Sequence, residues 1–295
     1  MNNIDQDTQL NTVQHSYNDI ELKVAIQGIK GSYHHSVAQA FYGDSVIVDE
    51  CLSFRDVVHS LEEGRSTDAV MAIENSIAGS IIPNYAYIDE HDFYINGEFY
   101  LPIHHCIMAL PGETISSIRE VWSHPMALLQ CKEYLRGYTH IKLVEDSDTA
   151  DVAKRIQEHK IKGVAAIAGE TAAHIYGLHI LEKEIQTIKS NSTRFFIISK
   201  GKRDTNLVDK INKASLKFLT DHKRGSLATV LNVMSDCKLN LTKIQSLPVI
   251  DKPWKYSFFV DVTFEDYQDF KKAESILQIM ALELKILGEY TNQNL

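Results

Sequence analysis

The sequence has little of what marks several large classes of protein. It has only four cysteines in 295 residues, and none of them forms a Cys-x-x-Cys pair: Cys51, Cys106, Cys131 and Cys237. This scatter argues against a disulfide framework and against a zinc ribbon, and it is typical of a protein kept in the reducing cytoplasm. The sequence also has no apolar run close to the ~20 residues that a membrane-spanning helix needs, so we expect no membrane span.

An excess of positive charge is absent as well. The chain has 30 Lys and Arg against 39 Asp and Glu, a formal net charge of −9. We therefore expect neither nucleic acid nor an anionic membrane surface as a partner. Hydrophobic residues make up 44% and charged residues 23%, which is ordinary for a folded chain, and the length suits about two domains.

Short apolar segments alternate with amphipathic segments from residue 22 to residue 200. Strands are expected at 23–27, 45–48, 69–74, 103–110, 121–123, 141–144, 164–168 and 195–199, and helices at 34–41, 53–63, 80–89, 126–136, 148–159 and 170–176. This alternation predicts an α/β domain with largely parallel sheets. Residues 1–21 have no apolar periodicity and are expected to be a leader.

A second domain is expected near the C-terminus. The charge-dense stretch 201–213 is interpreted as a linker, and residues 214–291 give the order strand, helix, strand, strand, helix, strand. That order is the ferredoxin-like βαββαβ plan. A sheet this small has an edge that needs a partner, so we expect a homodimer or a tetramer.

Polar clusters follow four of the expected strands. They contain Ser32, the run from Glu74 to Ser76, the pair Ser123 and His124, and the run from Ser147 to Thr149. In open parallel sheets ligands bind beyond the carboxyl ends of the strands, and the N-termini of the following helices favour anions. Taken singly, each cluster is more often just a helix cap. Four of them together predict binding of a small dianion.

Motifs for other chemistry are missing. The turn from Gly28 to Gly31 has neither the G-x-G-x-x-G glycines nor the G-K-[ST] ending of a nucleotide site. The pairs His34-His35 and His104-His105 have no accompanying H-E-x-x-H spacing or Cys/Asp set. We expect neither a metal ion nor an organic cofactor.

The triplet Thr193-Arg194-Phe195 opens the last strand of the first domain. Arg194 could hold a carboxylate with its rigid guanidinium fork, and Thr193 could donate to a leaving oxygen. For an isolated triplet, a surface ion pair and a β-forming threonine would be the better interpretation. The rest of the sequence therefore has to decide.

Taken in order, the motifs resemble those of the prephenate dehydratase family with a C-terminal ACT regulatory domain. Residues 74–79 resemble the family's E-N-S-x-x-G segment, residues 123–131 its S-H-P-Q-A-x-x-Q-C segment with Met126 in place of the first Gln, residues 176–178 its Y-G-L, and residues 193–195 its T-R-F signature. The resemblance runs from about residue 23 to residue 290.

The resemblance implies a two-lobed catalytic domain like the type II periplasmic binding proteins at 22–200, with its second lobe inserted at about 104–186, and an ACT domain at 214–291. It implies a lyase of phenylalanine biosynthesis that converts prephenate to phenylpyruvate by decarboxylative dehydration, without a metal or an organic cofactor. A leader of about twenty residues cannot form the helical bundle of a chorismate mutase, so we expect the monofunctional form.

The resemblance also implies roles for individual residues. Thr193 would donate to the leaving hydroxyl. The implied catalytic residues are Thr193, Asn75, Gln130 and Ser123, and the implied substrate-binding residues are Ser32, Glu74, Ser76, Thr149, Arg194 and Phe195, with Arg194 either binding an anion or bracing the site.

In the C-terminal domain the resemblance implies phenylalanine as an effector, bound at Gly225, Leu227, Asn240, Gln245 and Ser246. Residues 245–248 are Gln-Ser-Leu-Pro where the family has E-S-R-P, so one charge of each sign is lost. We therefore expect weakened or altered regulation. Alternative functions are an arogenate dehydratase, a non-catalytic amino-acid-sensing binding protein and, as the weakest, a metal-dependent hydrolase.

Overall fold

The computed structural model describes residues 22–203, 210–221, 223–249 and 255–293. The expected leader at 1–21 and residues 204–209 of the expected linker lie outside the described residues. In the described part, no helix is long and apolar enough to cross a membrane. All four cysteines are buried and free.

The strands of the first lobe form one part of a long mixed sheet. Its strands are β1 (Lys23–Gln27), β2 (Ile47–Cys51), β3 (Asp68–Asn75), the short β4 (Gly79–Ser80), β5 (Tyr94–Pro102) and β11 (Ser192–Ser199), and its helices are α1 (Tyr33–Tyr42), α2 (Phe54–Glu62) and α3 (Ile82–Glu90). The strand order is β5-β11-β3-β1-β2, with β1 parallel to both β2 and β3. Strand β11 is antiparallel to β3 and to β5.

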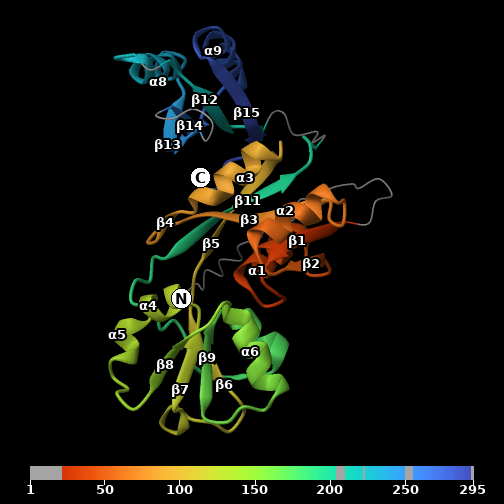
Figure 1. The fold of residues 1–295 in the computed structure, drawn as a ribbon, viewed down its shortest axis with the longest axis vertical. Helices are drawn as coiled ribbons and strands as arrows, with labels where there is room; N and C mark the ends of the chain where they lie inside the picture. The colour runs from red at the N-terminus through yellow and green to blue at the C-terminus, as the bar shows by residue number, and fades with distance from the viewer. Residues whose placement is uncertain (1–21, 204–209, 222, 250–254, 294–295) are drawn as a thin grey trace, which may run out of the picture.

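The second lobe lies between β5 and β11 in the chain (Figure 1). Its sheet has the order β10-β6-β9-β7-β8. Its elements are β6 (Cys106–Ala109), η1 (Ile115–Ser117), β7 (Glu120–Ser123), α4 (Pro125–Gln130), α5 (Lys132–Leu135), β8 (Lys142–Glu145), α6 (Thr149–Glu158), β9 (Val164–Ala168), α7 (Glu170–Tyr176) and β10 (His179–Glu182). The chain thus leaves the first lobe through β5 and returns through β11.

The C-terminal domain has the expected βαββαβ order. Its elements are β12 (Lys213–Leu219), α8 (Ser226–Asp236), β13 (Asn240–Pro248), β14 (Tyr256–Thr263), α9 (Tyr267–Met280) and β15 (Glu283–Tyr290). The four strands pair antiparallel in the order β13-β14-β12-β15. Its core holds buried side chains of both helices, such as Val230 and Leu277. Lys213, the last residue of the expected linker, is the first residue of β12.

The two halves of the long sheet meet between β15 and β5. Gly288 pairs with Ile95 in parallel register. A Cβ atom on Gly288 would lie 2.3 Å from the carbonyl oxygen of Ile95, so only glycine fits at this junction. The strands of the C-terminal domain are thereby continuous with those of the first lobe.

Several elements differ from the expectations. Strands β5 and β10 were not expected. Strand β2 covers 47–51 instead of the expected 45–48, and β6 begins at Cys106 instead of at residue 103. Strand β5 was missed because Asn96, Gly97 and Glu98 interrupt its apolar pattern. Glu98 is fully buried with cationic partners from other elements, which a local pattern cannot show. The sheets are also more mixed than expected, since β5, β11, β6 and β10 pair antiparallel.

Candidate active site

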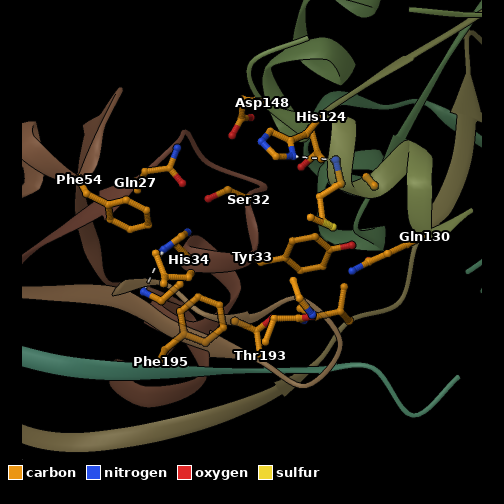
Figure 2. A pocket seen from close by; sticks show the side chains of 18 of the residues that line it. Gln27, Ser32, Tyr33, His34, Phe54, His124, Gln130, Asp148, Thr193 and Phe195 are labelled. Atoms are coloured by element: carbon orange, nitrogen blue, oxygen red, sulfur yellow. Dashed lines mark hydrogen bonds between the residues drawn. The ribbon is translucent and has the colours of Figure 1, made fainter. Parts of the chain in front are cut away.

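A cavity of about 520 Å³ opens between the two lobes (Figure 2). Most of the residues expected to be catalytic or substrate-binding line this cavity: Ser32, Asn75, Gln130, Thr149, Thr193 and Phe195. Met126, which replaces the family's Gln, lines it too. Strand ends and helix starts of both lobes supply this lining, as expected for an α/β fold.

Thr193 and Asn75 form the centre of the arrangement. They are register partners on β11 and β3, and Asn75 Nδ2 donates to Thr193 Oγ1 at 2.9 Å. Asn75 Oδ1 accepts the backbone N–H groups of Ile77 and Ala78, which fixes the orientation of the amide. Thr193 is therefore an acceptor on its protein side. No acceptor takes its own proton among the described residues, so this proton can point into the cavity.

A chain of hydrogen bonds continues from this pair into the second lobe. Asn75 Nδ2 also donates to Asn191 Oδ1 at 2.7 Å, and Asn191 Nδ2 donates to Gln130 Oε1 at 3.0 Å. His105 Nε2 lies 2.8 Å from the same Gln130 oxygen. With Gln130 Oε1 occupied as an acceptor, its amide nitrogen is left for a ligand, and Figure 2 shows that nitrogen directed towards the cavity.

The chain ends at a tyrosine of the first lobe. Tyr33 Oη lies 2.8 Å from His105 Nδ1 and 3.0 Å from the carbonyl oxygen of His104. Burial raises the pKa of Tyr33 well above its usual value and lowers the pKa of His105. With its proton on Nε2, a neutral imidazole donates to Gln130 Oε1 and leaves Nδ1 as an acceptor, so Nδ1 and the His104 carbonyl oxygen share the single phenol proton of Tyr33.

The cavity holds anion-binding groups without fixed cations. No Lys or Arg side chain lines it within the described ranges, and burial lowers the pKa of the lining residue His34 to about 3. Among the helices that begin at its wall are α1, which Ser32 caps by accepting from His35 N, and α6, which Asp148 caps by accepting from Asp151 N at 2.8 Å. Helix N-termini and neutral donors are thus the groups available to an anion.

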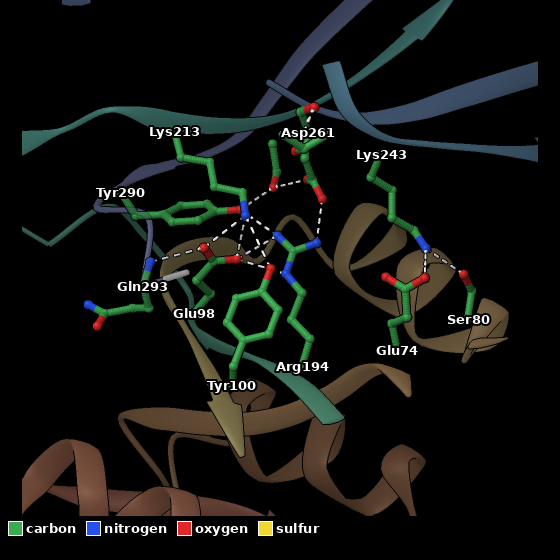
Figure 3. A network of polar contacts seen from close by, with 12 residues as sticks. Glu74, Ser80, Glu98, Tyr100, Arg194, Lys213, Lys243, Asp261, Tyr290 and Gln293 are labelled. Carbon is green, nitrogen blue, oxygen red and sulfur yellow. Dashed lines mark hydrogen bonds and ion pairs between the residues drawn. The ribbon is translucent and has the colours of Figure 1, made fainter. Parts of the chain in front are cut away.

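Arg194 corrects one expectation. Thr193 and Phe195 line the cavity, whereas the alternation of the strand turns Arg194 to the opposite face of the sheet. There its side chain is 5% exposed, its Nε donates to Glu98 at 2.7 Å, and the guanidinium also pairs with Asp261 and donates to Tyr290 (Figure 3). The expectation that Arg194 binds substrate is wrong, and its position fits the alternative of a brace.

Three further expected residues do not line the cavity. Glu74 faces the same side as Arg194 and pairs with Lys243. Ser76 accepts from the backbone N–H of Ser192, which ties β3 to β11. Ser123 is fully buried and donates to the carbonyl oxygen of Ile167 at 2.6 Å, inside the second lobe. Their hydroxyl and carboxylate groups serve the fold instead of a ligand.

Tyr33, His105 and Asn191 were not expected as members of the site. In the sequence, His105 was considered only as half of a possible metal-binding pair. In the described ranges, no group of three or more His, Cys, Asp or Glu side chains could hold a metal ion. Tyr33 and His105 are 72 residues apart, so no local spacing links them. The one signal was the position of Tyr33 directly after the Ser32 cap.

The expected effector residues lie in two groups. Gly225 (φ +87°) precedes α8, and Leu227 lies in its first turn beside a hollow of about 140 Å³. Asn240 begins the edge strand β13, which also carries Gln245 and Ser246. Asn240 pairs with Thr263, at the end of the small sheet away from Leu219 and the α8 start. Within one chain, Gly225 and Asn240 are therefore apart.

Comparison with known proteins supports one family. The prephenate dehydratase family model matches residues 24–203. An arogenate dehydratase/prephenate dehydratase 2 of Arabidopsis thaliana is 35% identical, covering 92% of this chain and 74% of the relative. A bifunctional chorismate mutase/prephenate dehydratase of Buchnera aphidicola is 31% identical, covering 98% of this chain and 76% of the relative.

Solved structures agree on the fold. A prephenate dehydratase from Staphylococcus aureus is similar with a TM-score of 0.78 at 25% identity, covering 92% of this chain and all of that chain. One from Arthrobacter aurescens in complex with L-Phe has a TM-score of 0.81 at 22% identity, covering 92% and 90%. A protein described as a novel type of quorum quenching acylase has a TM-score of 0.81 at 26% identity, covering 92% and 98%.

The expected α/β architecture, with a two-lobed catalytic domain and a βαββαβ domain, is thus confirmed. The family model spans more than half of the chain, and the dehydratases of this family are lyases. With Thr193, Asn75 and Gln130 assembled at the cleft, the chain belongs to the prephenate dehydratase family.

Proposed function

We propose that this chain converts prephenate to phenylpyruvate in the cavity between its lobes. In that reaction the carboxylate on the ring leaves as CO₂, and the electron pair of the broken C–C bond enters the ring as it becomes aromatic. The C–O bond to the ring hydroxyl breaks at the same time, and this oxygen takes up a proton and leaves as water. The protein therefore has to hold a dianion and donate to the departing oxygen.

The observation that carries the proposal is the polarity of the Asn75–Thr193 pair. Because Asn75 donates to Thr193 Oγ1, the Thr193 proton is available to a ligand oxygen in the cavity. The amide nitrogen of Gln130 and the N-termini of α1 and α6 would hold the carboxylates and the keto group.

The experiment compares turnover of prephenate by the wild type, Thr193→Val and Thr193→Ser. Removal of one positioned donor should lower kcat by about 10²–10³, with KM little changed, since valine keeps the shape and loses the proton. Thr193→Ser keeps the hydroxyl and should retain most of the wild-type kcat. A Thr193→Val variant with near-normal kcat would remove the assigned role of Thr193.

Arogenate is the closest alternative substrate, because it carries an amino group where prephenate has the keto group. The Arabidopsis relative is named for both activities. Parallel assays with both substrates decide the preference. If neither is turned over and calorimetry shows tight amino-acid binding, the non-catalytic sensor is the correct function.

Acyl hydrolysis has less support in this cavity. Among the described residues, no serine or cysteine side chain hydrogen-bonds to a histidine ring, which is the usual arrangement of an activated nucleophile. The acylase among the similar structures therefore shares the fold with this chain, and we infer no acylase activity from it.

An amino-acid effector is part of the proposal, together with a cytoplasmic location and a homo-oligomer. The βαββαβ domain and the similar structure solved with L-Phe support phenylalanine as that effector. Gln245 stands at a partly buried position of β13 where the family has Glu, so inhibition should be weak. Titration with phenylalanine tests this: the wild type should resist low micromolar concentrations, and Gln245→Glu should be more sensitive than the wild type.

A further inference from the structure

Two pairs of charged residues face each other between the C-terminal domain and the first lobe. Glu74 and Arg194 are register partners on β3 and β11, and Lys243 and Asp261 are register partners on β13 and β14. Lys243 pairs with Glu74, and Asp261 pairs with Arg194 (Figure 3). Two residues that lie opposite each other on neighbouring strands of the first lobe therefore bind two residues that lie opposite each other in the C-terminal domain. In each contact the two charges are opposite.

These contacts lie directly behind the catalytic pair. Asn75 and Thr193 are the register partners one step along from Glu74 and Arg194. Successive residues of a strand point to opposite faces, so the same two backbones present donors to the cavity and charges to the C-terminal domain. A shift of the strands at 74 and 194 would therefore change the Asn75–Thr193 hydrogen bond.

The Arg194 contact is part of a closed, buried network. Lys213 Nζ binds both carboxylate oxygens of Glu98, at 2.8 and 2.9 Å, and Glu98 also binds Arg194. Two cations, Arg194 and Lys213, thus face two carboxylates, Glu98 and Asp261, and all four side chains are at most 5% exposed. Removal of any member would leave a buried charge without its partner, which is costly. This network fixes where the C-terminal domain docks.

The Lys243 contact is the looser of the two. Its side chains are 12% and 33% exposed, so solvent screens the pair. Lys243 Nζ also reaches Ser80 Oγ at 2.7 Å, and Ser80 lines the cavity. Strand β13, which carries Lys243, is the edge of the sheet and pairs only with β14 in the described structure.

We propose that Lys243 is a positioning residue for the reaction: it holds Glu74 and Ser80 and so sets the geometry of Asn75 and Thr193 from the other domain. This inference rests on the proposed function for its catalytic consequence. Because Gln245 lies two residues along the same edge strand, an amino acid that moves β13 acts on Asn75 through Lys243.

The test compares Lys243→Met with a matched control, Lys217→Met. Lys217 also joins the C-terminal domain to the first lobe, by a 2.7 Å contact with Asp89 of α3, and its pair is similarly exposed at 14% and 19%. Its partner in the first lobe lies on a helix, away from the strands of the catalytic pair, and its other partner is Glu283 of its own domain. Lys243→Met should lower kcat about 10-fold with KM within about twofold, because a small misplacement of a donor costs rate. Lys217→Met should leave kcat near the wild-type value.

Two more measurements make the outcome decisive. The conservative variant Lys243→Arg should keep kcat within about threefold of the wild type, since it keeps a cation opposite Glu74. The side-chain amide signals of Asn75 in the ¹⁵N-labelled protein, assigned by their loss in Asn75→Asp, should shift in Lys243→Met and stay in place in Lys217→Met. This readout needs no turnover, so it tests the positioning role even if the wild type does not act on prephenate.

The proposal would be overturned if Lys243→Met had the kcat of the wild type and its Asn75 side-chain signals did not shift from their wild-type positions. An equal loss of activity in both lysine variants would do the same, because it would indicate that only domain docking matters. Failure of the wild type on prephenate and arogenate would instead overturn the proposed function.

Discussion

His34 shows how one residue of the cavity links packing to pH. Its ring lies at 5.0 Å from that of Phe195 and 5.6 Å from that of Phe54, both in edge-to-face geometry, and its Nε2 accepts the backbone N–H of Ala72. Burial lowers its pKa from 6.5 to about 3. The imidazole is therefore neutral at pH 7.

This pKa predicts acid destabilisation. The unfolded chain takes up a proton near pH 6.5 and the folded chain only near pH 3, so the contribution to stability is complete above pH 6.5 and is lost as the pH falls towards 3. Between pH 7.0 and 5.5 the wild type should lose about 1 kcal/mol more free energy of unfolding than His34→Gln, which keeps an acceptor for Ala72. Urea unfolding at the two pH values measures this, and equal losses in both proteins would contradict it.

The triplet at 193–195 shows which features of the site can be predicted from the sequence and which cannot. Thr193 and Phe195 of this motif line the cavity, and period-two alternation alone would have turned Arg194 to the other face. The partners of Arg194 could not be foreseen, because Asp261 and Tyr290 belong to another domain. Likewise, the link between Tyr33 and His105 exists only in the folded chain.

Among the elements, strand β5 depends strongly on neighbours from distant parts of the chain. It pairs with β11 on one side and meets β15 on the other through Gly288. Helices with clear apolar faces and strands with uninterrupted runs were predictable from the sequence. Strand β5 was not, because its buried Glu98 is stabilised by charges that arrive from β11 and β12.

Gly288→Ala should disrupt this junction. The added methyl group would meet the carbonyl oxygen of Ile95 at 2.3 Å, and the backbone cannot yield as a flexible side chain would. We expect a loss of about 1–3 kcal/mol in the free energy of unfolding, the usual cost of overpacking.

Gly201→Ala is the control for this prediction, because a Cβ there has open space around it. Chemical unfolding of both variants provides the measurement. If the two alanine variants are equally stable, the close approach at Gly288 does not determine how β15 meets β5.

For the whole molecule, the continuous sheet and the buried charge network join the C-terminal domain to the first lobe. Domain pairs joined by small polar interfaces unfold separately, whereas this interface buries four charges. The two parts should therefore unfold together.

Asp261→Asn tests that connection. It leaves the Arg194 guanidinium with one carboxylate fewer in a buried site, which should cost about 3–5 kcal/mol. The partly buried pair removed by Lys217→Met should cost less, about 1 kcal/mol, because solvent still reaches both side chains. Calorimetry should give one transition for the wild type, and a wild type that melts in two well-separated steps would refute the coupling.

The alternation along β11 also bears on how the protein can misfold. If β11 paired with β3 one residue out of register, Arg194 would enter the cleft and Thr193 would face the C-terminal domain. A guanidinium would then occupy the place of the Thr193 hydroxyl, and Asp261 would meet no cation. A single slip would remove this hydroxyl from the cavity and prevent domain docking at once, so a chain that docks its C-terminal domain correctly has, by the same step, set Thr193 in place.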